Sequence, residues 1–305
     1  MAAGSDTVGQ TEVIAVDWGT SRLRAFCLGP GGVVLDRVQA EDGISTVPPG
    51  GFPAVLEERC GAWMRQAPEA PVVMAGMVGS RNGWAEAAYA TCPASPASLG
   101  ASMLSVTDRV SIVPGVIARQ AGGPDVMRGE ETLIFGTEVA DGLVCLPGTH
   151  SKWARVEEGA ITSFATFMTG ESYALYRHHS LLGRLATEPE DLSGFDEGLA
   201  AASDEAGLLN RLFQARARVL DGAMSGGRVG PYLSGLLVGA EVAGAFRRYG
   251  KRDSITLVAE GVIAAHYVAA LRASSVTVEI ITPEAAFLAG LSAIAAASRE
   301  HGGAR

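Results

Sequence analysis

Lysine is almost absent from this chain: Lys152 and Lys251 are the only two, and arginine supplies the other basic side chains. The formal net charge at pH 7 is -9. A protein that holds nucleic acid by its phosphates needs a basic surface, which this composition does not favour. We therefore expect no nucleic-acid partner. Each remaining lysine is either kept for a specific role or present by chance.

The usual cysteine and histidine motifs are also missing. The five histidines form no HExxH motif, and none stands at zinc-site spacing from a cysteine. Thiols scattered in apolar runs are typical of reduced, buried side chains in a cytoplasmic protein. The sequence therefore predicts no zinc site and no disulfide. The scattered cysteines, without a CxxC pair, are Cys27, Cys60, Cys92 and Cys145.

Neither a targeting segment nor a membrane span is evident. The first ten residues, MAAGSDTVGQ, have neither a basic start nor an apolar centre, so we expect a disordered tail over residues 1–10. The apolar stretch Ala285–Ala297 is too short for a bilayer, which needs about 20 apolar residues. The sequence predicts a soluble, cytoplasmic protein.

Two segments of similar plan follow one another, which predicts an α/β fold with two domains, 11–140 and 141–305. In each, three strands joined by hairpin turns precede helices and further strands. We expect each domain to hold a mixed sheet with a β-meander and flanking helices, and the last helix to pack back on the first domain. The expected strands are TEVIAVDW, RLRAFCLG, VVLDRVQ, APVVMAGM, LVCLPG, KWARVEEG, AITSFATF, SITLVAE and SVTVEII, and the expected helices cover 51–66, 171–182, 204–219, 231–249, 262–272 and 283–298.

A similar turn occurs in both halves, as DWGTSRLRAF from Asp17 and PGTHSKWARV from Pro147. A hairpin turn rich in Gly and Thr offers backbone N–H groups and a hydroxyl to an anion without a bulky side chain in the way. Asp17 precedes the first turn and is a candidate ligand for Mg²⁺, which prefers one or two carboxylates plus phosphates and water. The alternative is that Asp17 only caps the turn.

This arrangement resembles the actin-like ATPase superfamily of sugar kinases and chaperones. The resemblance implies two ribonuclease H-like domains with a cleft between them, where the first hairpin of each domain holds one end of the ATP phosphate chain. DWGTSRLRA also resembles the first phosphate motif of the carbohydrate kinases related to glycerol kinase. It implies metal and phosphate roles for Asp17, Gly19, Thr20 and Arg24, with Mg²⁺ held by Asp17 through a water molecule. In the second turn, Gly148 and Thr149 match the superfamily, whereas Lys152 is unusual there and is a candidate phosphate contact because of its charge.

The segment VMRGEETLIFG places Glu130 and Glu131 at the start of an expected helix. Acids in the first turn are favourable because of the helix dipole, so a charged helix start is one interpretation. In glycerol-kinase-like enzymes a Gly-Asp pair opens a helix at this place, and its acid is the general base. The resemblance assigns this role to Glu130, with Glu131 as the second candidate.

Other polar residues lie in segments that are not repeated. The glycine-rich loop in AGMVGSRNGWAEA follows a buried strand, where α/β enzymes place ligand contacts, and arginine can hold a carboxylate by two hydrogen bonds. A tight structural loop with a packed tryptophan is the alternative. In the second repeated turn, His150 is a ligand, a proton donor or a hydrogen-bonded structural residue. Lys152 either neutralises a phosphate or a substrate carboxylate, or is a solvated strand residue. The candidate substrate residues are Ser80, Arg81, Asn82, Trp84 and Arg128.

SGLLVGAEVAGAF and AEGVIAAHY stand where this superfamily binds adenosine. Their candidate contacts are Gly235, Gly239, Glu260 and Gly261, although close helix packing also explains such glycines. The motifs AGMVGSRNGW, VMRGEET, LPGTHSKW, FMTGE and SGLLVGAEV, in this order, resemble the 2-dehydro-3-deoxygalactonokinase family over nearly the whole chain.

This resemblance implies ATP-dependent phosphorylation of the terminal (C6) hydroxyl of 2-dehydro-3-deoxy-D-galactonate, in galactonate or galactose breakdown. ATP and a small sugar acid would be the partners, with no membrane, and a homodimer is one option for the assembly. Two alternatives stay open: a kinase of the same fold for another sugar acid or polyol, such as 2-dehydro-3-deoxygluconate, and a non-catalytic actin-like nucleotide switch.

Overall fold

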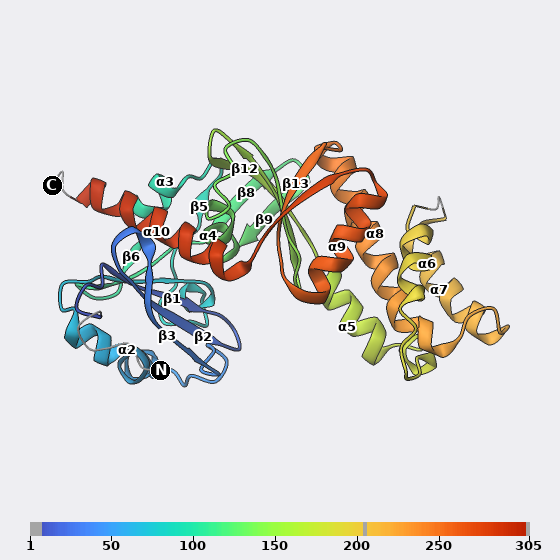
Figure 1. The fold of residues 1–305 in the computed structure, drawn as a ribbon, viewed down its shortest axis with the longest axis horizontal. Coiled ribbons are helices and arrows are strands. Elements are labelled where there is room, and N and C mark those ends of the chain that lie inside the picture. Colours follow the sequence, from blue (N-terminus) through green and yellow to red (C-terminus); the bar gives the residue numbers. More distant parts are fainter. Residues whose placement is uncertain (1–7, 204–205, 303–305) are drawn as a thin grey trace. The chain divides into compact units, whose positions relative to one another are not determined.

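The computed structural model describes residues 8–203 and 206–302 and divides into two compact units (Figure 1). The first unit comprises residues up to Asp141, Val156–Ser163 and the segment from Thr282; the second comprises Gly142–Arg155 and Phe164–Ile281. Residues 1–7 of the expected tail lie outside the described residues. Val8, however, is only 4% exposed and belongs to the first unit's core, so the expectation of disorder up to residue 10 is wrong at this position.

A mixed six-stranded sheet forms the centre of the first unit. Its strands are β1 (Val13–Trp18), β2 (Leu23–Leu28), β3 (Val34–Ala40), β4 (Val72–Ala75), β6 (Leu104–Ser105) and β7 (Val110–Ile112), in the order β3-β2-β1-β4-β7-β6. The hairpin strands β1, β2 and β3 pair antiparallel, whereas β4 runs parallel to both β1 and β7. The expected β-meander is therefore present, and β1 lies at its inner edge.

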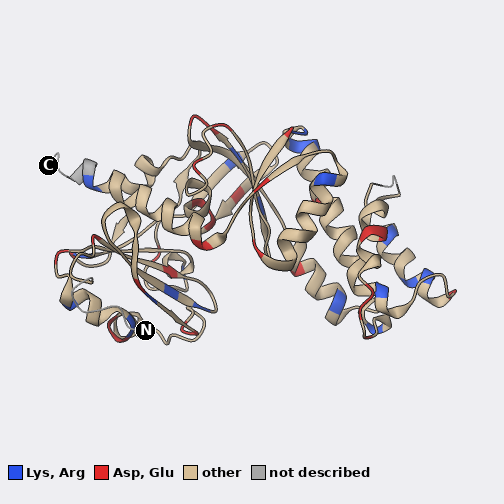
Figure 2. Ribbon diagram, in the orientation of Figure 1, with Lys and Arg blue, Asp and Glu red and all other residues tan. Residues whose placement is uncertain are grey.

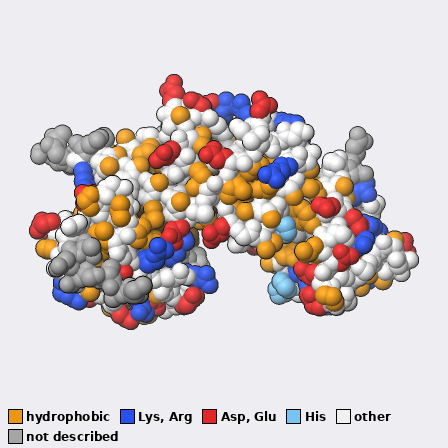
Figure 3. Space-filling view, in the orientation of Figure 1, with side chains coloured by type: hydrophobic (Ala, Val, Ile, Leu, Met, Phe, Trp, Pro, Cys, Tyr) orange, Lys and Arg blue, Asp and Glu red, His pale blue; other side chains and the backbone are white. Residues whose placement is uncertain are grey.

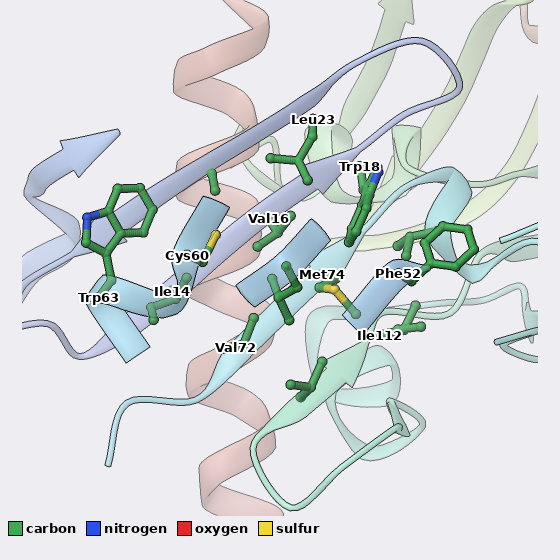
Figure 4. Close-up of a cluster of buried hydrophobic side chains, with 14 of the residues drawn as sticks. Ile14, Val16, Trp18, Leu23, Phe52, Cys60, Trp63, Val72, Met74 and Ile112 are labelled. Atoms are coloured by element: carbon green, nitrogen blue, oxygen red, sulfur yellow. The ribbon is translucent and has the colours of Figure 1, made fainter. Parts of the chain in front are cut away.

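Helix α2 (Phe52–Gln66) covers one face of this sheet. Side chains alternate between the two faces of a strand, so Ile14, Val16 and Trp18 of β1 share one face. They pack with Phe52 and Cys60 of α2 in the core that Figure 4 shows. Burying each large apolar side chain contributes roughly 1.5–3 kcal/mol. The same alternation turns Asp17 toward the opposite face.

That opposite face carries the last helix, α10 (Pro283–Gly302), together with α4 (Glu130–Phe135). Phe287 of α10 lies 6.1 Å, ring centre to ring centre, from Phe26 of β2. Where α4 and α10 cross, a Cβ atom added to Gly290 would overlap the carbonyl oxygen of Thr132. The two helix backbones therefore touch, and α10 determines where the start of α4 lies.

A small second sheet of the first unit was not anticipated from the sequence. It consists of β5 (Ala90–Thr91), β8 (Val116–Gln120) and β9 (Gly123–Met127), and the six-residue helix α3 (Pro96–Ala101) packs on α10. Strands this short show no periodicity that distinguishes them from loops. The sheet matters for the site because β9 ends at Met127, immediately before the residues that open α4.

The second unit is built on a five-stranded sheet with the order β12-β11-β10-β13-β14, and helices α8 and α9 pack on it. The outer ends of β11 and β12 group with the first unit. Short single-turn 3₁₀ helices cover Pro30–Gly32, Met77–Gly79, Gly183–Leu185 and Gly226–Arg228 of the chain. The elements of the second unit are β10 (Gly142–Leu146), β11 (Ser151–Glu157), β12 (Ala160–Phe167), α5 (Thr169–His179), α6 (Ser193–Ala201), α7 (Gly207–Leu220), α8 (Val229–Tyr249), β13 (Ser254–Val258), α9 (Gly261–Ala273) and β14 (Thr277–Ile281).

Helices α6, α7 and α8 pack together beside α9 (Figure 1). Acidic and basic residues stand side by side on them (Figure 2), and Arg228 pairs with both Asp191 and Glu197. By length and composition alone, the helical segment Gly226–Tyr249 could cross a membrane. Its most apolar window is 67% buried inside the structure, as is typical of a core helix in a soluble protein.

Candidate active site

Asp17 lies at the end of β1 and is directly opposite Arg24 in the antiparallel pairing with β2. The Nε atom of Arg24 donates to the Oδ2 atom of Asp17 at 3.0 Å, and a second guanidinium N–H donates to the same oxygen. Both side chains are partly buried: that of Asp17 is 24% exposed and that of Arg24 is 32% exposed. Asp17 is therefore fixed through one oxygen, while its other oxygen faces the neighbouring strand end at Gly76.

Two glycines allow the backbone to come close to Asp17. Gly76 follows β4 with φ +94°, and Gly129 precedes α4 with φ +105°, a region that favours glycine. A Cβ atom at Gly129 would lie 3.2 Å from the Cα atom of Gly76, and one at Gly76 would lie 3.5 Å from the Oδ1 atom of Asp17. The end of β4, the end of β1 and the start of α4 therefore meet at one point.

A cavity of about 180 Å³ opens at this meeting point, and Glu130 faces it from the start of α4. The backbone N–H of Arg128 donates to the Oε2 atom of Glu130 at 3.0 Å, which orients the carboxylate. Two of the sequence candidates for catalysis, Asp17 and Glu130, are therefore brought together. The cavity is lined by Asp17, Gly19, Ala75, Gly76, Met77, Arg128, Gly129, Glu130, Leu133 and Phe287.

Glu131 points away from solvent and is completely buried. Both of its carboxylate oxygens accept the backbone N–H of Gly129, at 2.9 and 2.8 Å. Burial raises the pKa of Glu131 to about 7, and the adjacent charge of Glu130 adds to the shift. Because Glu131 is not among the cavity residues, the geometry favours Glu130 over Glu131 as a group that can reach a ligand.

Arg128 is buried to 9% exposed at the cavity wall. One of its terminal nitrogens donates to the carbonyl of Ala87 at 2.8 Å, and its guanidinium lies 4.4 Å from the ring centre of Tyr89. Its Nε and Nη1 atoms have no hydrogen-bond partner within the described part of the chain. A buried guanidinium with unused donors is suited to an anionic ligand.

The other substrate candidates, in the loop after β4, are not brought into this cavity. Arg81 is 84% exposed and pairs with Glu86 at 3.6 Å. Trp84 stacks on Phe52 and packs against the core, so the packed-tryptophan alternative describes it. Asn82 is exposed, and the hydroxyl of Ser80 is buried without a partner among the described residues.

The second Gly-Thr turn joins β10 to β11 in the second unit. Thr149 and His150 are exposed, and the imidazole of His150 hydrogen-bonds the carboxylate of Glu171 in the first turn of α5. The start of α5 lies against the turn, since a Cβ atom at Gly170 would lie 2.5 Å from the carbonyl oxygen of Gly148. Lys152 is buried, at 4% exposed, and its Nζ atom donates to the carbonyl of His150 at 2.9 Å. Lys152 is therefore not a solvated residue.

A cavity of about 380 Å³ lies beside this turn, between α5, α8 and α9. Hydrophobic side chains gather over the region of α8 and α9 (Figure 3), and Val262 and Ile263 at the start of α9 line the cavity. Glu260 and Gly261 directly precede these two residues and are exposed. The cavity is lined by Gly148, Thr169, Gly170, Tyr173, Glu190, Leu192, Pro231, Ser234, Leu237, Val238, Val262, Ile263, His266 and Tyr267.

The two other adenosine candidates lie on a different side of α8. A Cβ atom at Gly235 would overlap the carbonyl oxygen of Phe195, and one at Gly239 would lie 2.5 Å from the Cβ atom of Ala202. Both glycines therefore allow α8 to pack closely against α6. Close helix packing was the alternative to adenosine contact for these two residues.

Sequence reasoning did not assign a role to Glu241, which is buried in α8 at 3% exposed. It accepts hydrogen bonds from Trp153, Thr169 and Tyr267. The one available signal was an acid inside the otherwise apolar helix SGLLVGAEVAGAF. Such an acid is costly to bury unless it has hydrogen-bond partners.

A family model described as 2-keto-3-deoxy-galactonokinase matches residues 17–294. The chain belongs to this family. The matched range contains both Gly-Thr turns and the start of α4. It begins at Asp17 itself and ends within α10, so it includes both units.

Curated relatives have similar lengths. The 2-dehydro-3-deoxygalactonokinase of Escherichia coli (strain K12) is 38% identical over 285 residues, which covers 92% of this chain and 97% of that protein. The Rhizobium meliloti (strain 1021) protein DgoK1, assigned as a 2-dehydro-3-deoxygalactonokinase, is 35% identical over 295 residues and covers 93% and 96%.

Solved structures agree with these matches. A Sinorhizobium meliloti protein assigned as a 2-dehydro-3-deoxygalactonokinase aligns with a TM-score of 0.87 at 34% identity, over 93% of this chain and 98% of that one. The activator of the 2-hydroxyisocaproyl-CoA dehydratase from Clostridium difficile, with bound ADPNP, aligns at 14% identity with a TM-score of 0.51, over 96% and 98%. At that identity the likeness concerns the fold alone. The fold class is that of the actin-like ATPases and sugar kinases, as the β-meanders indicate.

Proposed function

We propose that this protein is an ATP-dependent kinase that phosphorylates the terminal (C6) hydroxyl of 2-dehydro-3-deoxy-D-galactonate in galactonate or galactose catabolism. The family match over residues 17–294 supports the reaction class and the substrate. The observation that carries the proposal is the convergence of Asp17, Arg128 and Glu130 on one cavity of the first unit. These three side chains supply a metal ligand, a carboxylate binder and a base.

Glu130 acts as the general base in this proposal. It takes the proton of the C6 hydroxyl as that oxygen attacks the γ-phosphorus of ATP, and ADP leaves with the electrons of the broken bond. The hydrogen bond from the backbone of Arg128 to one carboxylate oxygen leaves the group oriented for this step. Phosphoryl transfer requires little else from the protein than positioning and neutralisation of charge.

The phosphates are held by the two turns in the proposal. Gly19, Thr20 and Arg24 contact the phosphates at the first turn, and Gly148, Thr149 and Lys152 contact them at the second. No group of three or more His, Cys, Asp or Glu side chains within residues 8–203 and 206–302 could hold a metal ion by itself. Asp17 is a single carboxylate beside a cavity, which fits an Mg²⁺ ion that keeps water and phosphate oxygens as its other ligands. Bound Mg²⁺ would offset negative charge on the phosphates.

The sugar-acid carboxylate binds Arg128 in this proposal, because the arginine lines the cavity and its Nε and Nη1 atoms have no hydrogen-bond partner among residues 8–203 and 206–302. Ser80, Arg81, Asn82 and Trp84 belong to the adjacent loop and stay secondary candidates. The adenosine part of ATP occupies the apolar cavity of the second unit, next to Glu260 and Gly261. We further propose a cytoplasmic protein without nucleic-acid or membrane partners, and a homodimer as one option for its assembly.

An ADP-release assay tests the function. Purified protein is incubated with ATP and Mg²⁺ and with one acceptor at a time: 2-dehydro-3-deoxy-D-galactonate, its gluconate-derived epimer, glycerol, gluconate or none. We expect the galactonate-derived acid to give the highest kcat/KM, and mass spectrometry of its product to show one added phosphoryl group at C6. Activity on glycerol alone, or ADP release that no acceptor stimulates, would contradict the proposal.

A further inference from the structure

Glu241 lies at the centre of a buried cluster in the second unit, together with Trp153, Thr169, Tyr267 and Ser151, which we call the Glu241 cluster. The indole Nε1 of Trp153 donates to the Oε1 atom of Glu241 at 2.8 Å, and the hydroxyl of Tyr267 donates to its Oε2 atom at 2.6 Å. The hydroxyl of Thr169 donates to the same Oε2 atom. One carboxylate on α8 thus joins β11, α5 and α9.

The hydrogen bonds that favour the ionised carboxylate come from neutral donors. Burial raises the pKa of Glu241 above its ordinary value, and these donors oppose that change. A buried carboxylate costs free energy unless its lone pairs are satisfied. An apolar side chain in α8 would avoid this cost, so the position of the carboxylate calls for an explanation.

Two routes lead from Glu241 to the same turn. In the first, the hydroxyl of Tyr267 also bonds the hydroxyl of Ser151 at 3.0 Å, and that oxygen accepts the backbone N–H of Gly148 at 3.3 Å. In the second, Thr169 is the first residue of α5. Two residues further along the helix, the backbone N–H of Glu171 donates to the carbonyl of Thr149 at 3.0 Å.

The turn Gly148–His150 is therefore held by two hydrogen-bonded connections, one through Ser151 and one through the start of α5. Both connections lead to the carboxylate of Glu241. Gly148, Thr169 and Tyr267 also line the cavity of about 380 Å³. We propose that Glu241 is a positioning residue for the nucleotide: it fixes the second Gly-Thr turn and the start of α5 relative to the adjacent cavity. This inference rests on the proposed function, because it takes the turn to bind the ATP phosphates.

The isosteric variant Glu241→Gln tests the inference. Its amide keeps one acceptor oxygen but faces the remaining hydroxyl donors with an NH₂ group, so at least one support must rearrange. We expect the dissociation constant for ATP, measured by calorimetry without sugar acid, to rise on the order of tenfold to 100-fold. The KM for the sugar acid should stay within about twofold of wild type, because the proposed sugar-acid residues Arg128 and Glu130 belong to the first unit and the Glu241 cluster to the second. Mutations in separate units have largely independent effects.

Leu212→Ala is the matched control. Leu212 is buried in the core of α7 and α8, outside the Glu241 cluster, so its truncation destabilises the same unit. We expect it to lower the melting temperature and leave ATP affinity unchanged. Tyr267→Phe is the second variant: it removes only the hydroxyl that joins Glu241 to Ser151 and should weaken ATP binding in the same direction.

Two results would overturn the inference: unchanged ATP affinity in both Glu241→Gln and Tyr267→Phe, or a loss of ATP affinity in Leu212→Ala equal to theirs. The binding measurement also separates this inference from the proposed function. If the wild-type protein binds ATP but transfers no phosphoryl group to any sugar acid, the proposed reaction is wrong, and the comparison of ATP affinities still decides the role of Glu241.

Discussion

Glu131 holds the backbone N–H of Gly129 with both of its carboxylate oxygens, at 2.9 and 2.8 Å, and it does so without any exposure to solvent. Gly129 has φ +105°, and the residue between them is Glu130. The buried acid thus fixes the turn that presents Glu130, which is only partly buried and lines the cavity. Two neighbouring glutamates have different environments, and this difference leads to a prediction about pH.

The first prediction concerns the stability of Glu131→Gln. The pKa of Glu131 in the folded protein is about 7, against an ordinary value of 4.5. Between these values the unfolded chain loses the proton while the folded protein keeps it, so stability falls as the pH rises through this window. Above pH 7 the loss is complete, on the order of 1–3 kcal/mol. Glutamine cannot ionise, and its oxygen can still accept from Gly129.

Urea unfolding of wild type and Glu131→Gln at pH 5 and pH 8 checks this prediction. The variant should gain stability relative to wild type as the pH rises, and most of the gain should appear between the two values. Glu138→Gln changes an exposed glutamate a few residues away and should follow the wild-type curve. A variant that loses stability equally at both pH values would show that the carboxylate is needed in its ionised form.

The second prediction concerns Glu130→Gln. If Glu130 takes the proton of the attacking hydroxyl, its loss should lower kcat by about 10²–10⁴-fold, the usual contribution of a general base. ATP affinity should change little, because the amide still accepts the N–H of Arg128. Steady-state rates with both substrates saturating, together with calorimetric ATP binding, provide the measurement. A rate near wild type would mean that the base is elsewhere.

The third prediction is that Gly290→Ala impairs both stability and turnover, although Gly290 belongs to α10 and is not among the residues that line the cavity. The added methyl group would overlap the carbonyl oxygen of Thr132, so α4 must move away from α10. Overpacking of this kind costs about 1–3 kcal/mol. A shift of α4 also displaces Glu130, so kcat should fall. Gly122→Ala is the control, because a Cβ atom there would meet nothing within 4 Å.

The two β-meanders could be predicted from the sequence, because β1, β2 and β10 are mainly apolar runs and turn residues separate the neighbouring strands. The position of Asp17 near the end of β1 could also be predicted, because the apolar run VIAV stops immediately before it. The short strands β5, β8 and β9 could not be predicted, because two to five residues are too few to show the alternation of apolar and polar side chains. The fixed orientation of Glu130 depends on a backbone contact with Arg128, which no residue pattern reveals.

Two glycines show a related limit. Gly76 and Gly235 look alike in the sequence, each in a small-residue stretch. Gly76 has φ +94° and lets the chain approach Asp17, whereas Gly235 allows α6 to touch α8. Which backbone passes a glycine depends on residues far away in the chain. A glycine in the sequence therefore shows that a close approach is possible without showing which residue makes it.

The last prediction separates the two arginines that the sequence offered for the sugar-acid carboxylate. Arg128 is 9% exposed at the cavity wall, and two of its nitrogens have no hydrogen-bond partner in the described part of the chain. The side chain of Arg81 is 84% exposed and already pairs with Glu86. A hydrogen bond to a charged group contributes about 1.5–3 kcal/mol. Arg128→Lys keeps the charge but cannot form a two-pronged bond, so the KM for the sugar acid should rise on the order of 10- to 100-fold, with ATP affinity unchanged. Arg81→Ala should leave both constants near wild type in the same steady-state assay. The reverse pattern would move the carboxylate site from the cavity to the exposed loop, and with it the orientation of the substrate relative to Glu130.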